Sequence, residues 1–359
     1  MAVLASAAFV YVTAEMVPVG ALPDIAADLR VSEAVVGTLL ASYALVAAVT
    51  TVPLVRLTAH WPRRRTLMVT LVCLTASQLI SALAPNFAVL AGGRVLCALT
   101  HGLMWSVIAP IGARLVPATH TGRATTAIYA GTTLALVLGN PLTAAMSELW
   151  GWRQAVVVVT VAAAAVTAAA WVTLPPMVLS AAEVDTVRSH DRHHRRGRLM
   201  TLSVLTLVGV TGHFISYTFI VVIIRDVVGV EGPNLAWLLA GFGVAGLTAM
   251  AVMAKPADRH PKASVLGCLG ALAAAFTVLA ALAGGRLPGA AAIALGAAAI
   301  IAWGAASTAL APILQAIAMR TAPDDPDGAS GVYVTAFQSG SWPGPCSAGC
   351  STSRPAPRR

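Results

Sequence analysis

Long apolar stretches alternate with short polar segments along the whole chain. The apolar stretches cover residues 2–22, 34–54, 66–84, 88–116, 124–146, 153–175, 199–224, 234–254, 263–284 and 288–318, and an eleventh begins near residue 328. Their lengths match the roughly 20 residues that a helix needs to cross a hydrocarbon core about 30 Å thick. They are rich in Ala, Leu, Val and Gly and lack the two-residue alternation of outer-membrane strands. The pattern therefore predicts an all-α polytopic membrane protein.

The composition supports this class and excludes others. Hydrophobic residues make up 58% of the chain and charged residues only 10%, and the mean hydropathy is +0.80. A soluble domain with a polar surface does not have such a composition. The net charge of +9 would suit nucleic acid, but Lys and Arg are scattered over span ends and short loops, where they set the topology instead. We expect the lipid bilayer, and no nucleic acid, as a partner.

Positive charge marks alternate loops. The loops after the second, fourth and eighth spans carry Arg56, Arg63, Arg64, Arg65, Arg114, Arg123, Lys255, Arg259 and Lys262. By the positive-inside rule these loops face the cytoplasm, as does the N-terminus. The loop after the tenth span departs from this pattern, with Asp324, Asp325 and Asp327 beside Arg320. Because no Lys or Arg precedes Arg30, we expect residues 1–22 to be a retained helix rather than a signal peptide. The expected location is the bacterial plasma (inner) membrane.

A polar central segment divides the chain into two sets of spans. We predict an N-terminal six-helix bundle over residues 1–175, a cytoplasmic loop over 176–198 and a C-terminal bundle over 199–340. The loop contains His190, His193 and His194, which could bind a metal, but we interpret it as a solvated linker. A basic turn follows the second helix of each half, His60-Trp61-Pro62-Arg63 and Arg259-His260-Pro261-Lys262. Such internal repeats are typical of secondary transporters.

The composition changes abruptly within the eleventh apolar stretch. After Ser339 the chain contains Pro343, Pro345 and several glycines, which cannot continue a spanning helix. We therefore expect residues 341–359 to form a non-helical tail and the C-terminal bundle to be truncated after the start of helix 11. An evolved polar tail is one explanation. A change of reading frame or a degraded gene is the preferred one, because the break falls inside a helix.

One acidic residue, Glu15, lies well inside an apolar span. A charged side chain at the centre of a membrane helix costs about 2.5 to 3.5 kcal/mol, close to the combined gain from the apolar residues of this span. Such a carboxyl group should line a wet cavity, carry a proton or pair with a cation. We interpret Glu15 as a proton-coupling residue. A structural hydrogen bond within the bundle is the alternative.

Further polar residues lie on the fourth span, where Arg94, His101 and Trp105 share one helical face. A cation and an imidazole on a cavity-facing stripe could hold a proton or an anionic group, because His titrates near neutral pH. The alternative is that Arg94 extends to the membrane surface and that His101 is a satisfied core residue. The predicted substrate cavity is lined by Tyr11, Trp105, His213 and Tyr217.

Several catalytic motifs are absent from the sequence. The two lysines follow Ala254 and Pro261, so the chain has no G-x-x-x-x-G-K-[ST] phosphate loop, and it also lacks H-E-x-x-H and G-x-S-x-G. Cys346 and Cys350 have no nearby His or further Cys with which to build a zinc site. We therefore expect no enzymatic activity, no cofactor and no bound metal.

With these residues the chain resembles the major facilitator superfamily, in particular its drug:proton antiporter branch, which includes sugar and arabinose efflux permeases. The resemblance covers about residues 1–338. Its first-helix signature is similar to Thr13-Ala-Glu15-Met-Val-Pro18-Val-Gly20-Ala-Leu-Pro23-Asp-Ile-Ala-Ala-Asp28-Leu, and its fourth-helix motif to Arg94-Val-Leu-Cys-Ala-Leu-Thr-His101-Gly102. The family's signature loop, G-x-L-x-D-R-x-x-R-R, is matched by Leu57, Arg63 and Arg64 but not by Val55 and Ala59. Its second-half counterpart keeps Asp258, Arg259 and Lys262.

The fifth-helix antiporter motif is only partly present, as Leu138-Gly139-Asn140-Pro141-Leu142, where the proline also interrupts the helix. The resemblance implies a major facilitator fold of two six-helix bundles that rock about a central site. It implies proton-coupled export of a drug, sugar or metabolite, with Glu15 as the proton acceptor and with Arg94 and His101 beside it. The gating residues are then Arg63, Arg64, Asn140, Pro141, Asp258, Arg259 and Lys262.

The partners expected from this interpretation are a small-molecule substrate, protons and lipid, and the protein is expected to act as a monomer. Two alternatives remain. The chain could be a facilitator or importer without proton coupling, or it could be a truncated remnant or membrane scaffold without transport activity.

Overall fold

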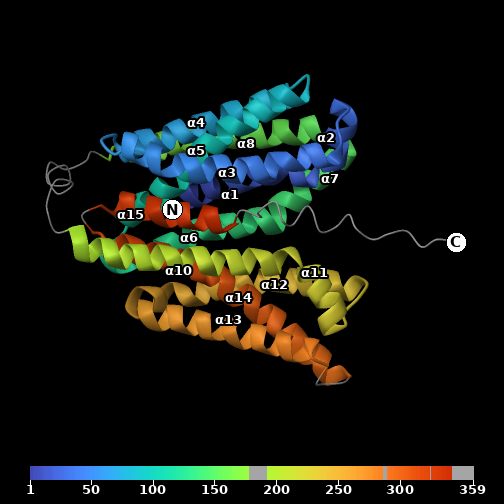
Figure 1. Cartoon of the computed structure of the whole chain (residues 1–359). Helices are drawn as coiled ribbons and strands as arrows, with labels where there is room; N and C mark the ends of the chain where they lie inside the picture. The colour runs from blue at the N-terminus through green and yellow to red at the C-terminus, as the bar shows by residue number, and fades with distance from the viewer. Residues whose placement is uncertain (178–191, 286–288, 324, 342–359) are drawn as a thin grey trace.

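The computed structural model describes residues 1–177, 192–285, 289–323 and 325–341. Within these ranges the regular structure is helical, and ten helical segments are long and apolar enough to cross a membrane. Figure 1 shows the long helices lying side by side in two groups. The prediction of an all-α polytopic membrane protein is confirmed.

The first group contains the helices up to residue 173. They are α1 (Ala2–Gly20), α2 (Leu22–Leu29), α3 (Glu33–Leu57), α4 (Arg63–Ala82), α5 (Phe87–Arg114), the 3-10 turn η1 (Ala118–His120), α6 (Thr121–Leu134), the π-helical turn η2 (Ala135–Gly139), α7 (Asn140–Trp150) and α8 (Trp152–Thr173). Two starts are set by side-chain caps, because Ser32 and Asn86 accept hydrogen bonds from the backbone N–H groups of Val35 and Val89.

The first span is shorter than predicted, because α1 ends at Gly20 and the short helix α2 follows. Asp28 of α2 accepts hydrogen bonds from Trp152 and Arg153 at the start of α8. The bond from Arg153 is the main cause that lowers the pKa of Asp28 below its ordinary value. Asp28 thus belongs to a polar contact that fixes α2 at one end of the bundle.

The second group contains α10 (Arg192–Thr218), α11 (Ile220–Val222), the π-helical turn η3 (Ile223–Val228), α12 (Pro233–Arg259), α13 (Pro261–Ala283), α14 (Ala290–Thr321) and α15 (Pro326–Ser341). Helix α10 begins within the segment 176–198 that was expected to be a loop. Arginine is a good helix former outside the membrane as well as at its edge, which explains the longer helix. The seventh span also ends earlier than predicted, at Thr218.

Two expectations lie outside the described part of the chain. His190 is not described, and the side chains of His193 and His194 are not described either, so the interpretation of this cluster as a linker stays a prediction. Residues 342–359 are also outside the described ranges. The non-helical tail and the truncation of helix 11 therefore remain predictions.

Helices α6 and α15 lie between the two groups (Figure 1). Helix α6 contacts α1 on one side and α12 and α14 on the other, whereas α15 contacts α3 and α5 as well as α10 and α14. Tyr333 and Val334 of α15 belong to the same hydrophobic core as α1, α4 and α5. The boundary between bundles at 1–175 and 199–340 stays a prediction, and each group contributes one helix that packs against the other.

Small residues let the helices approach closely. A Cβ atom on Gly131 of α6 would overlap the backbone carbonyl oxygen of Ala5 in α1, and one on Gly102 of α5 would overlap the Thr51 side chain of α3. Such small-residue contacts are typical of helix packing in membranes. They place α5 at the centre of the first group, where residues from Cys97 to Gly112 are almost all buried.

Candidate functional site

Arg94 joins α5 to α1 next to the acidic residue singled out in the sequence. Its two terminal nitrogens donate hydrogen bonds to the backbone carbonyl oxygens of Ala14 and Glu15, each 2.7 Å long. Its guanidinium also lies over the ring of Tyr43 in α3, 5.0 Å from the ring centroid. Arg94 is buried, with 3% of its surface exposed, so its guanidinium packs between the helices of the first group.

The acidic side chain itself lies near an imidazole. The Oε2 atom of Glu15 is 3.9 Å from Nδ1 of His101, and the Glu15 side chain keeps 17% of its surface exposed while His101 keeps 3%. Glu15 is about one and a half turns from the end of α1 at Gly20. The structure therefore brings Glu15, Arg94 and His101 together, as the sequence predicted.

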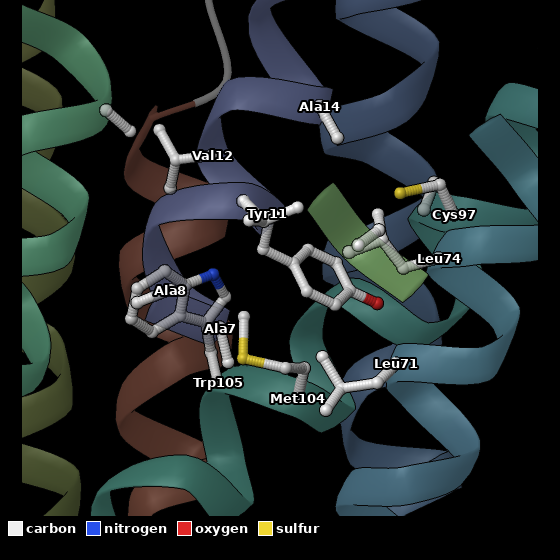
Figure 2. Packing of buried hydrophobic residues seen from close by; sticks show 14 of the residues in the cluster. Ala7, Ala8, Tyr11, Val12, Ala14, Leu71, Leu74, Cys97, Met104 and Trp105 are labelled. Carbon is white, nitrogen blue, oxygen red and sulfur yellow. The ribbon is translucent and has the colours of Figure 1, made fainter. Parts of the chain in front are cut away.

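Other side chains lie closer to His101 than Glu15 does. The hydroxyl of Tyr43 lies 2.8 Å from Nδ1 of His101 and 3.3 Å from Sγ of Cys97. Tyr11 also meets the imidazole, edge to face, with ring centroids 5.7 Å apart. The Tyr11 hydroxyl shares a hydrogen bond of 2.8 Å with the Thr100 hydroxyl instead. In Figure 2 the Tyr11 ring points from α1 toward Leu71, Leu74 and Met104.

Aromatic side chains connect this site to the second group of helices, and we call them the aromatic path. It begins at His101, whose ring contacts Trp105, which in turn contacts Tyr129 of α6. The side chains of Tyr129 and Tyr333 interact with each other. The path then continues through Tyr333, Phe337, Phe214, His213, Tyr217, Trp303, Phe242 and Phe276. The predicted cavity residues Tyr11 and Trp105 thus lie in one run of ring contacts and His213 and Tyr217 in a second run, and the pair Tyr129 and Tyr333 joins the two runs.

At the far end of the path, His213 is held by Trp303. The indole Nε1 of Trp303 donates a hydrogen bond of 3.0 Å to Nδ1 of His213, and Tyr217 stacks on the imidazole at 5.8 Å. Because an indole N–H can only donate, Nδ1 of His213 must be the unprotonated nitrogen. The proton of neutral His213 is therefore on Nε2, which is a donor.

Gln315 of α14 forms hydrogen bonds to two other helices beside the aromatic path. Its Nε2 donates to the backbone carbonyl oxygen of Trp105, 3.1 Å away, and to the hydroxyl of Ser330 in α15, 2.9 Å away. Gln315 is fully buried, and its Oε1 atom has no hydrogen-bond partner among the described residues. This residue links helices of both groups close to His101.

Two buried carboxylates join the groups at the end of the molecule that carries the basic loops. Asp327 at the start of α15 lies 2.6 Å from Nε of Arg63 and 3.3 Å from Arg114. Asp258 of α12 lies 2.9 Å from Arg320 and 3.5 Å from Arg123. Asp258 also accepts a hydrogen bond of 2.6 Å from the backbone N–H of Gly122, at the start of α6. A carboxylate near a helix start is stabilised by the helix dipole as well as by the arginines.

The remaining predicted gating residues are less closely connected. Arg64 donates to the carbonyl oxygen of Trp171 in α8 and lies over its ring, which keeps it within the first group. Arg259 and Lys262 are exposed. Pro141 follows the π-helical turn η2, so the predicted interruption of the fifth span is present. The side chain of Asn140 is outside the described part of the structure.

Two further carboxylates are more buried within the protein than Glu15, although neither lies inside an apolar span. The side chains of Asp258 and Asp327 are only 2% and 3% exposed, against 17% for Glu15. The reason is that burial within the protein differs from depth in the membrane. Asp258 and Asp327 lie near helix ends, where the hydropathy pattern gives no signal, and packing between the two groups buries them.

Sequence reasoning also missed Tyr43, Gln315 and Trp303. Gln315 is an isolated polar residue in an Ala-rich and Leu-rich span, which is the same signal that identified Glu15. Tyr43 and Trp303 are single aromatic residues in apolar spans, and nothing in their spacing distinguishes them from lipid-facing aromatics. Their roles depend on contacts between helices that are distant in sequence.

The apolar helices of the described structure define a multi-pass membrane protein, and Glu15 lies within it beside Arg94 and His101. The profile of the Major Facilitator Superfamily matches residues 4–345. The chain therefore belongs to the Major Facilitator Superfamily, a family of secondary transporters.

Close relatives and solved structures agree with this membership. The chain is 66% identical over 340 residues to the chloramphenicol efflux pumps of two Mycobacterium tuberculosis strains, H37Rv and CDC 1551, and the match covers 95% of this chain and 82% of each pump. Its fold is similar to that of the human organic anion transporter MFSD10, with a TM-score of 0.73 at 14% identity, covering 95% of this chain and 91% of that protein. The fucose:proton symporter FucP of E. coli gives a TM-score of 0.70 at 14% identity, covering 95% and 89%.

Proposed function

We propose that this transporter exports a small, uncharged aromatic molecule of the chloramphenicol type in exchange for protons. The observation that carries the proposal is the group formed by Glu15, Arg94 and His101 at the start of the aromatic path. The 66% identity to chloramphenicol efflux pumps supports the direction of transport and the class of substrate.

Glu15 is the proton acceptor in this proposal. Burial favours the neutral carboxylic acid, whereas the nearby guanidinium of Arg94 favours the carboxylate. These opposing effects suit a group that must bind and release a proton in each cycle. Part of the Glu15 side chain is exposed, so water can reach it. The hydrogen bonds of Arg94 go to backbone carbonyl oxygens rather than to the Glu15 carboxylate.

The aromatic path is the proposed substrate-binding region. Aromatic rings bind an aromatic substrate through offset or edge-to-face contacts. At its far end, Nε2–H of His213 offers a hydrogen-bond donor to a substrate nitro, carbonyl or hydroxyl oxygen, because Nδ1 is occupied by Trp303. The path contains rings from both groups of helices, so a bound substrate would contact both halves, as alternating access requires.

The buried carboxylates are the proposed gate. Asp258 with Arg123 and Arg320, and Asp327 with Arg63 and Arg114, hold the two groups together at one end. By the distribution of positive charge this end faces the cytoplasm, and the N-terminus lies on the same side. Breaking these ion pairs would open the site to the cytoplasm, and remaking them would close it.

The experiment that tests this function uses purified protein in proteoliposomes with labelled chloramphenicol and an imposed pH gradient. We expect the label to move against its own gradient in exchange for protons, and this movement to stop when an ionophore dissipates the pH gradient. Glu15→Gln should abolish gradient-driven movement while keeping exchange of labelled for unlabelled substrate, because the substrate site remains and only the proton acceptor is lost.

Two results would contradict the proposal. Movement of the label that ignores the pH gradient would indicate a facilitator. Unchanged gradient-driven transport in Glu15→Gln would show that another group carries the proton. The matched control is Glu148→Gln, which replaces an acid in the same half that lies outside the site.

A further inference from the structure

We infer that Tyr43 is a positioning residue that sets the pH at which the Glu15–His101 pair releases its proton. This inference rests on the proposed role of Glu15 in proton coupling. It concerns a residue of α3 that the first-helix and fourth-helix motifs do not contain, and it is carried by the geometry around a single nitrogen atom, Nδ1 of His101.

Nδ1 of His101 has two possible partners at different distances. The Tyr43 hydroxyl is 2.8 Å away, at hydrogen-bonding distance, whereas Oε2 of Glu15 is 3.9 Å away, about one ångström too far for a direct bond. An imidazole nitrogen forms one hydrogen bond at a time, as acceptor when bare and as donor when protonated. Tyr43 and Glu15 therefore compete for the same atom, and Tyr43 occupies it in this structure.

The surroundings allow Tyr43 to form a hydrogen bond with His101 whether or not Nδ1 of His101 carries a proton. When Nδ1 is bare, the Tyr43 O–H donates to it; when Nδ1 carries a proton, the Tyr43 oxygen accepts and its own proton turns to Sγ of Cys97, 3.3 Å away. The titratable and charged groups that the described structure places around this ring are Tyr11 and Glu15 from α1, Tyr43 from α3, Cys73 from α4 near Tyr11, and Arg94 and Cys97 from α5.

Removing the Tyr43 hydroxyl leaves Glu15 as the remaining partner of Nδ1. A movement of about one ångström then makes a direct bond, and the carboxyl and imidazole share one proton in a charge-assisted hydrogen bond, which is stronger than a neutral one. A proton held more tightly is released at higher pH. Tyr43→Phe should therefore raise the pH midpoint of transport, while its ring still covers Arg94.

The test measures substrate exchange and gradient-driven uptake against pH for wild type and Tyr43→Phe in proteoliposomes. We expect the midpoint of the uptake profile to rise by about one unit, a tenfold change in proton affinity. Tyr11→Phe is the matched control, because Tyr11 is also buried and also edge-on to His101 but bonds Thr100 rather than the imidazole nitrogen. Its midpoint should not move, whatever happens to its rate.

A second variant acts in the opposite direction and protects the test against a misfolded Tyr43→Phe. Cys97→Ala removes the alternative acceptor of the Tyr43 O–H. The hydroxyl then keeps donating to the bare Nδ1 and favours the unprotonated imidazole. The midpoint should fall. An unchanged midpoint in folded Tyr43→Phe would overturn the inference. If Tyr43→Phe does not fold, an unchanged midpoint in Cys97→Ala would overturn it. An equal shift in Tyr11→Phe would also overturn it. If Glu15→Gln left gradient-driven uptake unchanged, the proposed function itself would fail. That result is distinct from the absence of a shift in the pH midpoint of Tyr43→Phe.

Discussion

At the scale of single residues, the arrangement of Arg94 is the most specific feature of the site. A guanidinium is planar and carries several fixed donors, so it can bond two carbonyl oxygens and cover an aromatic ring at once. Arg94 does this with Ala14, Glu15 and Tyr43. The carbonyls it bonds belong to the helix that carries the proposed proton acceptor, so its position and that of Glu15 are coupled.

Arg94→Lys tests whether this geometry, rather than charge alone, is needed. Lysine keeps the positive charge but cannot donate to both carbonyls while lying over the ring. We expect gradient-driven uptake to fall by about tenfold, the equivalent of one lost charge-assisted hydrogen bond. Arg65→Lys is the control, because Arg65 covers the Trp61 ring outside the site. Equal uptake in wild type and Arg94→Lys would show that charge alone suffices.

The sequence revealed this site only in part. Glu15, Arg94 and His101 could be predicted because a charged or titratable side chain in an apolar span is an outlier that needs a physical reason. Their partners could not be, since Tyr43 and Cys97 are ordinary residues of apolar helices whose contacts arise from packing. The helical face shared by Arg94, His101 and Trp105 was also a weak signal, because α5 is buried on nearly all sides.

At the scale of helices, the contact between α1 and α6 depends on glycine. The backbone of α1 passes so close to Gly131 that a side chain there would overlap the Ala5 carbonyl oxygen, and a Cβ on Gly139 would overlap the Thr13 hydroxyl. Backbone atoms cannot rotate away as a flexible side chain can. The position of Glu15 on α1 is therefore fixed from the side of the fifth span.

Gly131→Ala should destabilise the protein by about 1–3 kcal/mol, the usual range for overpacking. The measurement is the thermal unfolding temperature in detergent, with size-exclusion chromatography used to measure the folded fraction after heating. Gly267→Ala is the control, since a Cβ on this α13 glycine would meet nothing within 4 Å. A Gly131→Ala protein as stable as the Gly267→Ala protein would contradict the packing described for α1 and α6.

The helix pattern was the easiest feature to predict from sequence, and helix ends were the hardest. The apolar stretches fixed the spans because backbone groups in lipid must be satisfied within a helix. Helix α2 was missed because it is short and contains a proline and two aspartates, and the early start of α10 was missed because it lies in a basic segment outside the apolar stretch. The interruption at Pro141 was predicted, but its form as a π-helical turn depends on neighbouring helices.

At the scale of the whole molecule, the two groups of helices are joined by ion pairs at one end and by the aromatic path in the interior. Asp258 shows how a helix of one group is tied to the other, because it contacts Gly122 and Arg123 at the start of α6 and Arg320 of α14. With Ala59 in place of the acid in the first-half loop, Asp327 supplies the carboxylate that Arg63 binds.

Asp258→Asn should shift the protein toward a conformation that is open at this end. The change leaves Arg123 and Arg320 without their carboxylate and weakens the contact with the start of α6. Spin labels on Leu57 of α3 and Ala263 of α13, both exposed, should report longer distances than in wild type. Asp226→Asn, which removes an exposed acid paired only with its neighbour Arg225 among the described residues, should leave the distances unchanged. Identical distributions for Asp258→Asn and wild type would mean that Asp258 does not hold the gate.

Exchange of substrate for protons at a site controlled by Glu15 requires that substrate binding displaces protons from the protein, and this release can be measured. Chloramphenicol is added to the purified protein in weakly buffered detergent solution, and the pH is followed. Wild type should release protons near the midpoint of its transport profile, whereas Glu15→Gln should bind the substrate without releasing them. Binding without proton release in wild type, or equal release in both proteins, would contradict exchange of substrate for a proton at Glu15.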